Sequence, residues 1–234
     1  MKKALWMAII LIMAVSIAGC GGDSTVVIVP NVVRILSDQP LDGDITRDAA
    51  TGGLTLPTFA TSTQNVVTGI VFDQISGAEI SESRGFLHFS LTGSGIPVDP
   101  ARITFAKVSV FVNSVTPAFA DPFAEVPFIV ELMDTAQFPA PIVSTDFDAP
   151  FASSKTTFFR SADGGNFVDI DITSLLQDAV ALGLNDFELR IRFDRGRFQT
   201  DPTTVRGVTE IDDADDIVGH RRADFAPILH VEFL

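Results

Sequence analysis

Alternation of apolar and polar residues with a period of two constrains this 234-residue chain more than any other feature of its sequence. In the clearest run, the apolar Phe187, Leu189, Ile191 and Phe193 alternate with Glu188, Arg190, Arg192 and Asp194. Successive side chains of a β-strand point to opposite faces, so such a run has one face in a core and the other toward solvent. We therefore expect Leu189 and Ile191 to be buried in a central strand, and Glu188, Arg190 and Arg192 to face outward.

The same alternation recurs along most of the chain. It is found in residues 86–91, 107–112, 128–132, 168–172 and 229–233, with glycine-containing turns at 92–95 and 163–166. Ile103 and Phe105 are out of phase with Val108, which predicts a β-bulge near Ala106. The polar stretch 37–53 is interpreted mainly as loop. This pattern predicts an all-β, antiparallel sandwich.

One segment departs from the β pattern. Ser174 and Gln177 have the spacing of a capping box, in which the serine hydroxyl accepts from the Gln177 amide and the glutamine side chain reaches back. Apolar residues follow at helical spacing, and Gly183 is placed to end the helix in a left-handed conformation. The sequence therefore predicts one short helix over about 174–182.

The N-terminus has the order of an export signal. Lys2 and Lys3 precede an apolar run, residues 4–15, and a small-residue stretch that ends in Ile17-Ala18-Gly19-Cys20. This tetrapeptide resembles the lipobox of bacterial lipoproteins. The resemblance implies that residues 1–19 are cleaved and that Cys20 carries a diacylglyceryl group and an acylated amine. Two or more acyl chains anchor a protein stably to a membrane. The alternative is an ordinary cleaved signal peptide followed by an incidental cysteine.

The predicted organisation has three parts: a lipoprotein signal peptide at 1–19, a lipidated N-terminus with a tether or first strand at 20–36, and a β-sandwich domain at 37–234. Residues 26–36 are apolar and form a strand pair or a buried arm in this interpretation. Gly21 follows the lipidated cysteine, where aspartate would favour inner-membrane retention in enterobacteria-like sorting. We therefore expect the protein in the cell membrane or the outer membrane, with the outer membrane favoured.

Charge excludes one class of partner. Without residues 1–19 the chain has 14 basic and 30 acidic residues, a net charge of −16. Such a chain repels phosphate backbones, which argues against binding to nucleic acid. Cys20 is the only cysteine, so its lipidation leaves no thiol for a disulfide.

The order of the strands resembles that of disaggregatase-related (DNRLRE) domains. Arg84–Leu91 (RGFLHFSL) is similar to their opening strand, Asp169–Gln177 (DIDITSLLQ) to their strand that runs into a Thr-Ser-Leu-Val-Gln segment, and Pro227–Phe233 to their closing strand. The resemblance covers roughly residues 66–234. It implies a jelly-roll-like β-sandwich, similar to carbohydrate-binding modules and often found in surface proteins.

No residue set indicates catalysis. The three histidines, His88, His220 and His230, are isolated in the sequence, and no nucleophile elbow, phosphate-binding glycine loop or zinc-binding helix motif is present. His88 and His230 occupy the polar phase of strands, where partly exposed structural histidines are common. We expect no enzyme. The alternative, a hydrolase with a dispersed active site, would need a histidine–carboxylate pair in a deep pocket.

Carbohydrate binding is the other alternative suggested by the fold. Sugar-binding sandwiches usually stack sugar rings on tryptophan or tyrosine. The chain has no tyrosine, and its single tryptophan, Trp6, lies in the signal peptide. Phe111 and Phe119 could be exposed, although a place in the core or an interface is favoured. We therefore expect a non-catalytic structural or interaction module of the cell envelope, with envelope proteins or polysaccharide as possible partners.

An acidic run at residues 210–216 is the best metal candidate. Calcium takes six to eight oxygen ligands, which Asp212, Asp213, Asp215 and Asp216 could supply in part. The spacing does not fit an EF-hand loop. A solvated acidic loop is the favoured alternative, so calcium remains a weak candidate and no other cofactor is expected. The residues at 42–44 and 163–166 are interpreted as turns.

Overall fold

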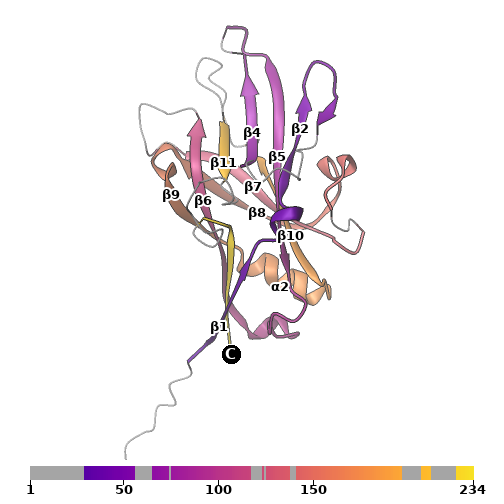
Figure 1. Cartoon of the computed structure of the whole chain (residues 1–234), viewed down its shortest axis with the longest axis vertical. Helices are drawn as coiled ribbons and strands as arrows, with labels where there is room; N and C mark the ends of the chain where they lie inside the picture. The colour runs from indigo at the N-terminus through magenta and orange to yellow at the C-terminus, as the bar shows by residue number, and fades with distance from the viewer. Residues whose placement is uncertain are drawn as a thin grey trace, which may run out of the picture.

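The computed structural model describes residues 29–55, 65–73, 75–116, 123, 125–137, 141–196, 207–211 and 225–234. These residues form an antiparallel β-sandwich with one α-helix, which confirms the predicted fold class (Figure 1). The strands are β1 (Asn31–Leu36), β2 (Gly43–Asp48), β3 (Leu54–Thr55), β4 (Val66–Phe72), β5 (Glu79–Ser90), β6 (Ile103–Thr116), β7 (Glu125–Met133), β8 (Phe151–Arg160), β9 (Asn166–Asp171), β10 (Asp186–Phe193), β11 (Gly207–Ile211) and β12 (Ile228–Phe233). The helix is α2 (Thr173–Ala181), and short 3₁₀ helices are η1 (Gln39–Leu41), η2 (Pro100–Arg102), η3 (Ser144–Phe147) and η4 (Ser161–Asp163).

Hydrogen bonds join the strands in the order β1-β12-β6-β11-β4-β5-β10-β7-β8, and β2 and β9 pair with β5 and β6. The long strand β5 connects the two layers, because its first half pairs with β4 and its second half with β10. β10, β7 and β8 therefore form one layer, and β6 with its neighbours forms the other. β1 is an edge strand on β12.

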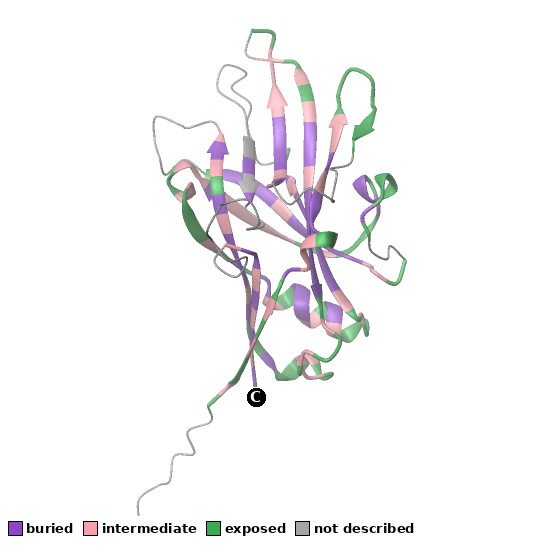
Figure 2. Ribbon diagram, viewed as in Figure 1, coloured by how far each residue is buried: buried purple, intermediate pink, exposed green. Residues whose placement is uncertain are grey.

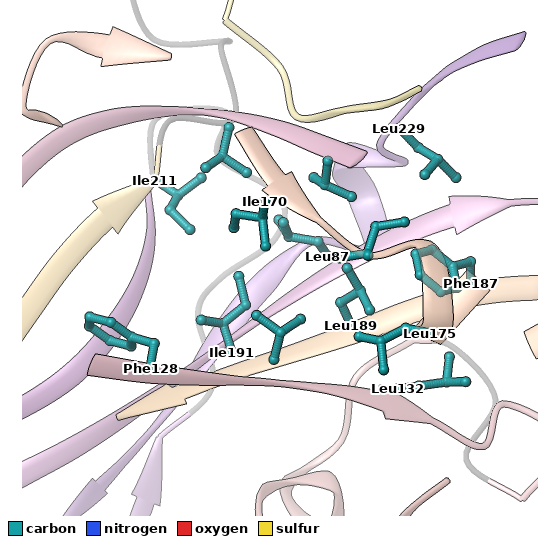
Figure 3. Packing of buried hydrophobic residues seen from close by; sticks show 14 of the residues in the cluster. Leu87, Phe128, Leu132, Ile170, Leu175, Phe187, Leu189, Ile191, Ile211 and Leu229 are labelled. Carbon is teal, nitrogen blue, oxygen red and sulfur yellow. The ribbon is translucent and has the colours of Figure 1, made fainter. Parts of the chain in front are cut away.

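The core lies between these layers. One cluster of buried apolar side chains contains Leu189 and Ile191 of β10, Leu87 of β5, Ile170 of β9 and Leu229 of β12 (Figure 3). Leu189 is 1% exposed and Ile191 is fully buried, so the predicted phase of the central strand is confirmed.

The opposite face of β10 contradicts the prediction. Glu188 and Arg190 are each only 2% exposed, and only Arg192 among the three keeps substantial access to solvent. Residues 141–150, including η3, lie over this face and exclude water from it. Alternation correctly separated the two faces, but the outer face is covered by a segment far away in the sequence.

Helix α2 begins one residue before the prediction, and the predicted capping box is absent from it. Ser174 lies inside the helix, and Gln177 Nε2 donates to the carbonyl of Ile103 at 2.9 Å. Asp171 instead accepts from the amide of Thr173 at 3.0 Å. Gly183 has the predicted left-handed conformation, with φ of 68°.

The β-bulge predicted near Ala106 is confirmed, and one loop differs from expectation. The bulge lies between Ile103 and Phe105, since these residues pair with the adjacent Phe233 and Glu232. The stretch expected to be mainly loop, 37–53, contains η1 and β2. Its single buried apolar side chain in β2 gives too weak an alternation to identify a strand from sequence.

No helix in the described part of the chain is long and apolar enough to span a membrane.

Candidate functional site

All five site residues named from the sequence lie outside the described residues. These are Cys20, Asp212, Asp213, Asp215 and Asp216, and the same holds for His220 and Phe119. Within the described ranges, no group of three or more histidine, cysteine, aspartate or glutamate side chains is arranged to hold a metal ion. The lipid anchor and the calcium site therefore stay predictions.

An ionic layer with a buried centre contains the largest group of interacting charged side chains in the described residues. It lies on the outer face of β5, β7 and β10 and extends to β2, to Arg195 two residues after β10, and to Asp148 just after η3. Its members are Arg47, Arg84, Arg190, Arg192, Arg195, Glu79, Glu82, Glu131 and Asp148. Sequence reasoning missed this layer because its residues alternate with core residues as exposed residues do.

Glu131 occupies the centre of one half of the layer and is fully buried. Its Oε2 accepts from Arg190 Nε at 2.7 Å, and Arg190 Nη2 lies 2.7 Å from the same oxygen. Arg192 Nε donates to Oε1 at 2.7 Å. Burial lowers the pKa of Arg190 from its ordinary value, and the charge of Glu131 opposes this shift. One carboxylate thus compensates two guanidinium groups, and its removal would leave a buried positive charge unpaired.

Glu82 holds the other half together and is 2% exposed. Its carboxylate is paired with three guanidinium groups: Arg47 Nη2 at 2.7 Å, Arg84 Nε at 2.8 Å and Arg195 Nη2 at 2.7 Å. Burial acts to raise the pKa of Glu82, but hydrogen bonds and charge from Arg195 and Arg84 outweigh it and hold the pKa below its usual range. Glu82 is therefore ionised and compensated within the protein.

The covering segment, residues 141–150, depends on these arginines for its position. The ring of Phe147 is 1% exposed and contacts two guanidinium groups, with Arg84 Cζ 4.0 Å and Arg47 Cζ 4.7 Å from its centroid. Such cation–π contacts strengthen when they are desolvated. Phe147 also packs with Phe86 in a small second core.

Backbone carbonyls complete this attachment. Arg190 Nη1 donates to the carbonyls of Asp146 and Phe147 at 2.7 and 3.1 Å, and Arg84 Nη1 also donates to the carbonyl of Phe147. The carbonyl of Asp146 also accepts from the backbone amide of Asp148 at the end of η3, so the arginines add to the hydrogen bonds of the turn. The ionic layer thus uses its donors to fasten a loop, and these donors are occupied within the chain.

An acidic cluster lies beside the layer, around Glu188. Burial raises the pKa of Glu188 to about 8, and the charges of Asp146, Asp186 and Asp42 add to this effect. Glu188 is therefore mainly protonated at neutral pH. Its cross-strand neighbour is His88, which is 4% exposed rather than partly exposed as expected from the sequence.

His88 and Asp186 form the histidine–carboxylate pair that the hydrolase alternative requires, with Nε2 3.7 Å from Oδ1. Burial lowers the pKa of His88, and the charge of Asp186 opposes this. The backbone of His88 is hydrogen-bonded on both sides. Its amide donates to Asp42 Oδ1 at 2.8 Å, and the carbonyl of His88 accepts from the Asp38 amide at 2.8 Å. These bonds hold η1 against β5, which gives the cluster a structural explanation.

A pocket of about 230 Å³ lies at the end of the sandwich beside α2. Its lining is Leu91, Thr92, Ile96, Pro97, Val98, Val180, Gly183, Leu184 and Asn185. Neither His88 nor Asp186 lines it, and it offers no titratable side chain. The pocket is therefore suited to an apolar contact rather than to acid–base chemistry.

Three phenylalanines gather on the outer face of the other layer, and we call them the outer phenylalanine cluster. Phe111 of β6 pairs in register with Phe167 of β9, and their ring centroids are 5.3 Å apart. Phe225 lies 4.5 Å from Phe111 and stacks on Phe167 at 6.5 Å. Phe167 is 47% exposed, and the other two rings are half-buried. The cluster thus exposes part of its ring surface, chiefly that of Phe167, and apolar surface gathered in one place can serve for contact with a partner.

Charged residues next to the cluster are paired with one another. Asp169 accepts from Lys107 Nζ at 2.6 Å and from the hydroxyl of Ser109. Lys155 Nζ of β8 donates to Asp171 of β9 at 2.6 Å and joins the edges of the two layers. The outer phenylalanine cluster thus lies among paired charges, and β9, which carries Phe167, is mostly exposed (Figure 2).

The sequence matches no known family model, and no characterised protein is similar enough to it to be identified as a relative. The resemblance to disaggregatase-related domains stays a prediction, and the function is inferred from the residues of this chain alone.

Proposed function

We propose that the protein is a cell-envelope lipoprotein, anchored through Cys20, that acts as a non-catalytic structural or interaction module. The outer phenylalanine cluster is the observation that favours this function most. It presents apolar ring surface to solvent, with Phe167 47% exposed. The buried arginines and carboxylates, by contrast, bond to one another and to the backbone of residues 141–150. The charged groups are thus used within the protein, whereas apolar ring surface faces solvent. This arrangement favours a role in binding a partner over a role in catalysis.

Replacing Cys20 by serine tests the anchor. The variant should lose lipidation and move from the membrane fraction to the soluble fraction, because no other residue of the predicted lipobox can carry the thioether. Intact-mass measurement of the native protein checks the modification, and fractionation checks the location. A native mass that shows an unmodified cysteine would contradict the proposal.

A carbohydrate-binding module is the second candidate, and the outer phenylalanine cluster favours it too. Rings on a sheet face can stack on sugars, although phenylalanine lacks the polar group that tyrosine and tryptophan offer at wet sites. The absence of both residues from the predicted mature chain makes us rank this candidate below a protein-binding module.

Glycan arrays separate these two candidates. We expect the native domain to show no measurable affinity for common polysaccharides, since it lacks the usual stacking residues. Glycan binding that is lost in Phe167→Ser, but retained in Phe151→Ser, would reverse the ranking. Phe151 is the matched control because it is 43% exposed and lies on β8, outside the cluster.

A further inference from the structure

One end of the sandwich, which we call the base, contains the start of β1, the last residue Leu234, residues 91–102 and α2. Asn31 pairs with Phe233, and the amide of Leu234 donates to the carbonyl of Arg102 at 3.0 Å. The pocket joins residues 91–98 to the end of α2. Figure 1 shows β1, the C-terminus and α2 at the same end, with the turn between β4 and β5 at the other. The chain therefore enters the domain at the base.

The base exposes large apolar side chains. Val98, which lines the pocket, is 93% exposed, and Leu182, next in sequence to the lining residue Gly183, is 56% exposed. Leu234 is 46% exposed, and Val29 and Val32 at the start of β1 are 76% and 57% exposed. Single exposed apolar residues are common, but here several lie at one end of the domain, together with a pocket that has leucine, isoleucine, proline and valine in its lining.

The short segment between the predicted anchor at Cys20 and the start of β1 keeps the base close to the membrane. Nine peptide units separate Cys20 from Val29, and they span at most about 30 Å even when fully extended. The twelve residues of β5 run from the turn between β4 and β5 toward the base and span about 40 Å. A chain anchored at Cys20 thus has its base nearest the bilayer.

We propose that the base is a membrane-contacting surface, in which Val98 and Leu182 enter the boundary between lipid headgroups and acyl chains. This inference rests on the proposed anchor at Cys20. The net charge of −16 disfavours electrostatic adhesion to anionic lipid, so the contact depends on burial of apolar surface. Nearby charges of both signs, Asp99 and Arg102, are consistent with a surface at the headgroup level.

A polarity-sensitive fluorophore at position 98 tests the contact. Cys20 is the only native cysteine and is consumed by lipidation, so Val98→Cys in the full lipidated chain provides a single reactive thiol. In vesicles of phosphatidylcholine and phosphatidylethanolamine we expect a blue-shifted emission and quenching by spin-labelled lipid. Ile75→Cys is the matched control, because Ile75 is 99% exposed in the turn between β4 and β5, at the end opposite the base. We expect several-fold weaker quenching there.

A second substitution tests the apolar nature of the contact. Leu182→Asp in the Val98→Cys chain should reduce quenching while Cys20 stays lipidated, because a charge at the interface opposes insertion. Equal, water-like emission from positions 98 and 75 on a chain whose mass proves lipidation would overturn this inference and leave the anchor intact. An unmodified Cys20 would overturn the anchor, and the inference with it.

Discussion

Replacement of Glu131 by glutamine is expected to lower the free energy of unfolding by about 3–5 kcal/mol, the usual cost of breaking a buried ion pair from one side. The variant keeps the shape of the side chain but removes the charge that compensates Arg190 and Arg192. Arg190 is 2% exposed and cannot regain water without displacing residues 141–150. Urea unfolding measures the change.

Glu125→Gln provides the control on the same strand. Glu125 pairs with Arg160, but both side chains are 43% exposed, and exposed pairs contribute only about 0–1 kcal/mol. Similar losses for the two variants would mean that water reaches Glu131 as freely as Glu125. The prediction would then be wrong, and the ionic layer would not be a buried one.

Replacement of Glu188 by glutamine is expected to stabilise the protein at alkaline pH. The pKa of Glu188 rises from 4.5 to about 8 on folding, so the folded protein holds this proton more tightly than the unfolded chain. The contribution of the protonated carboxyl group to the free energy of unfolding is fully present below pH 4.5. It falls as the pH rises and is lost at about pH 8. Glutamine is neutral throughout, so at pH 8 the variant should be more stable than the native protein by about 2–4 kcal/mol.

The difference between the two unfolding curves isolates Glu188 from His88, which titrates in both proteins. Calorimetry or far-ultraviolet dichroism across pH 4–8 measures it, with little difference expected at the acidic limit. Glu232→Gln on β12, where the side chain is partly exposed, serves as the control and should change stability by no more than about 0.5 kcal/mol. A constant difference between native protein and Glu188→Gln at all pH values would show that this carboxyl group does not gain a proton on folding.

Much of the architecture follows from local sequence. Period-two alternation identified the phase of β10, since Leu189 and Ile191 are buried as predicted. Helical spacing before Gly183 located α2 to within one residue. Strand β8 escaped prediction because most of its side chains are polar and only partly buried, which leaves no alternation to detect.

The ionic layer required the tertiary structure. Alternation states which side chains share a face of a strand, but it does not state what lies above that face. The sequence predicted that Glu188 and Arg190 are exposed, because they alternate with core residues. In the structure they are covered by residues 141–150, which lie more than 35 positions earlier in the sequence. Sequence determined the two faces of each strand through the period of the backbone. Which polar face is buried was determined only by the tertiary structure, because burial depends on contacts between segments that are remote in sequence.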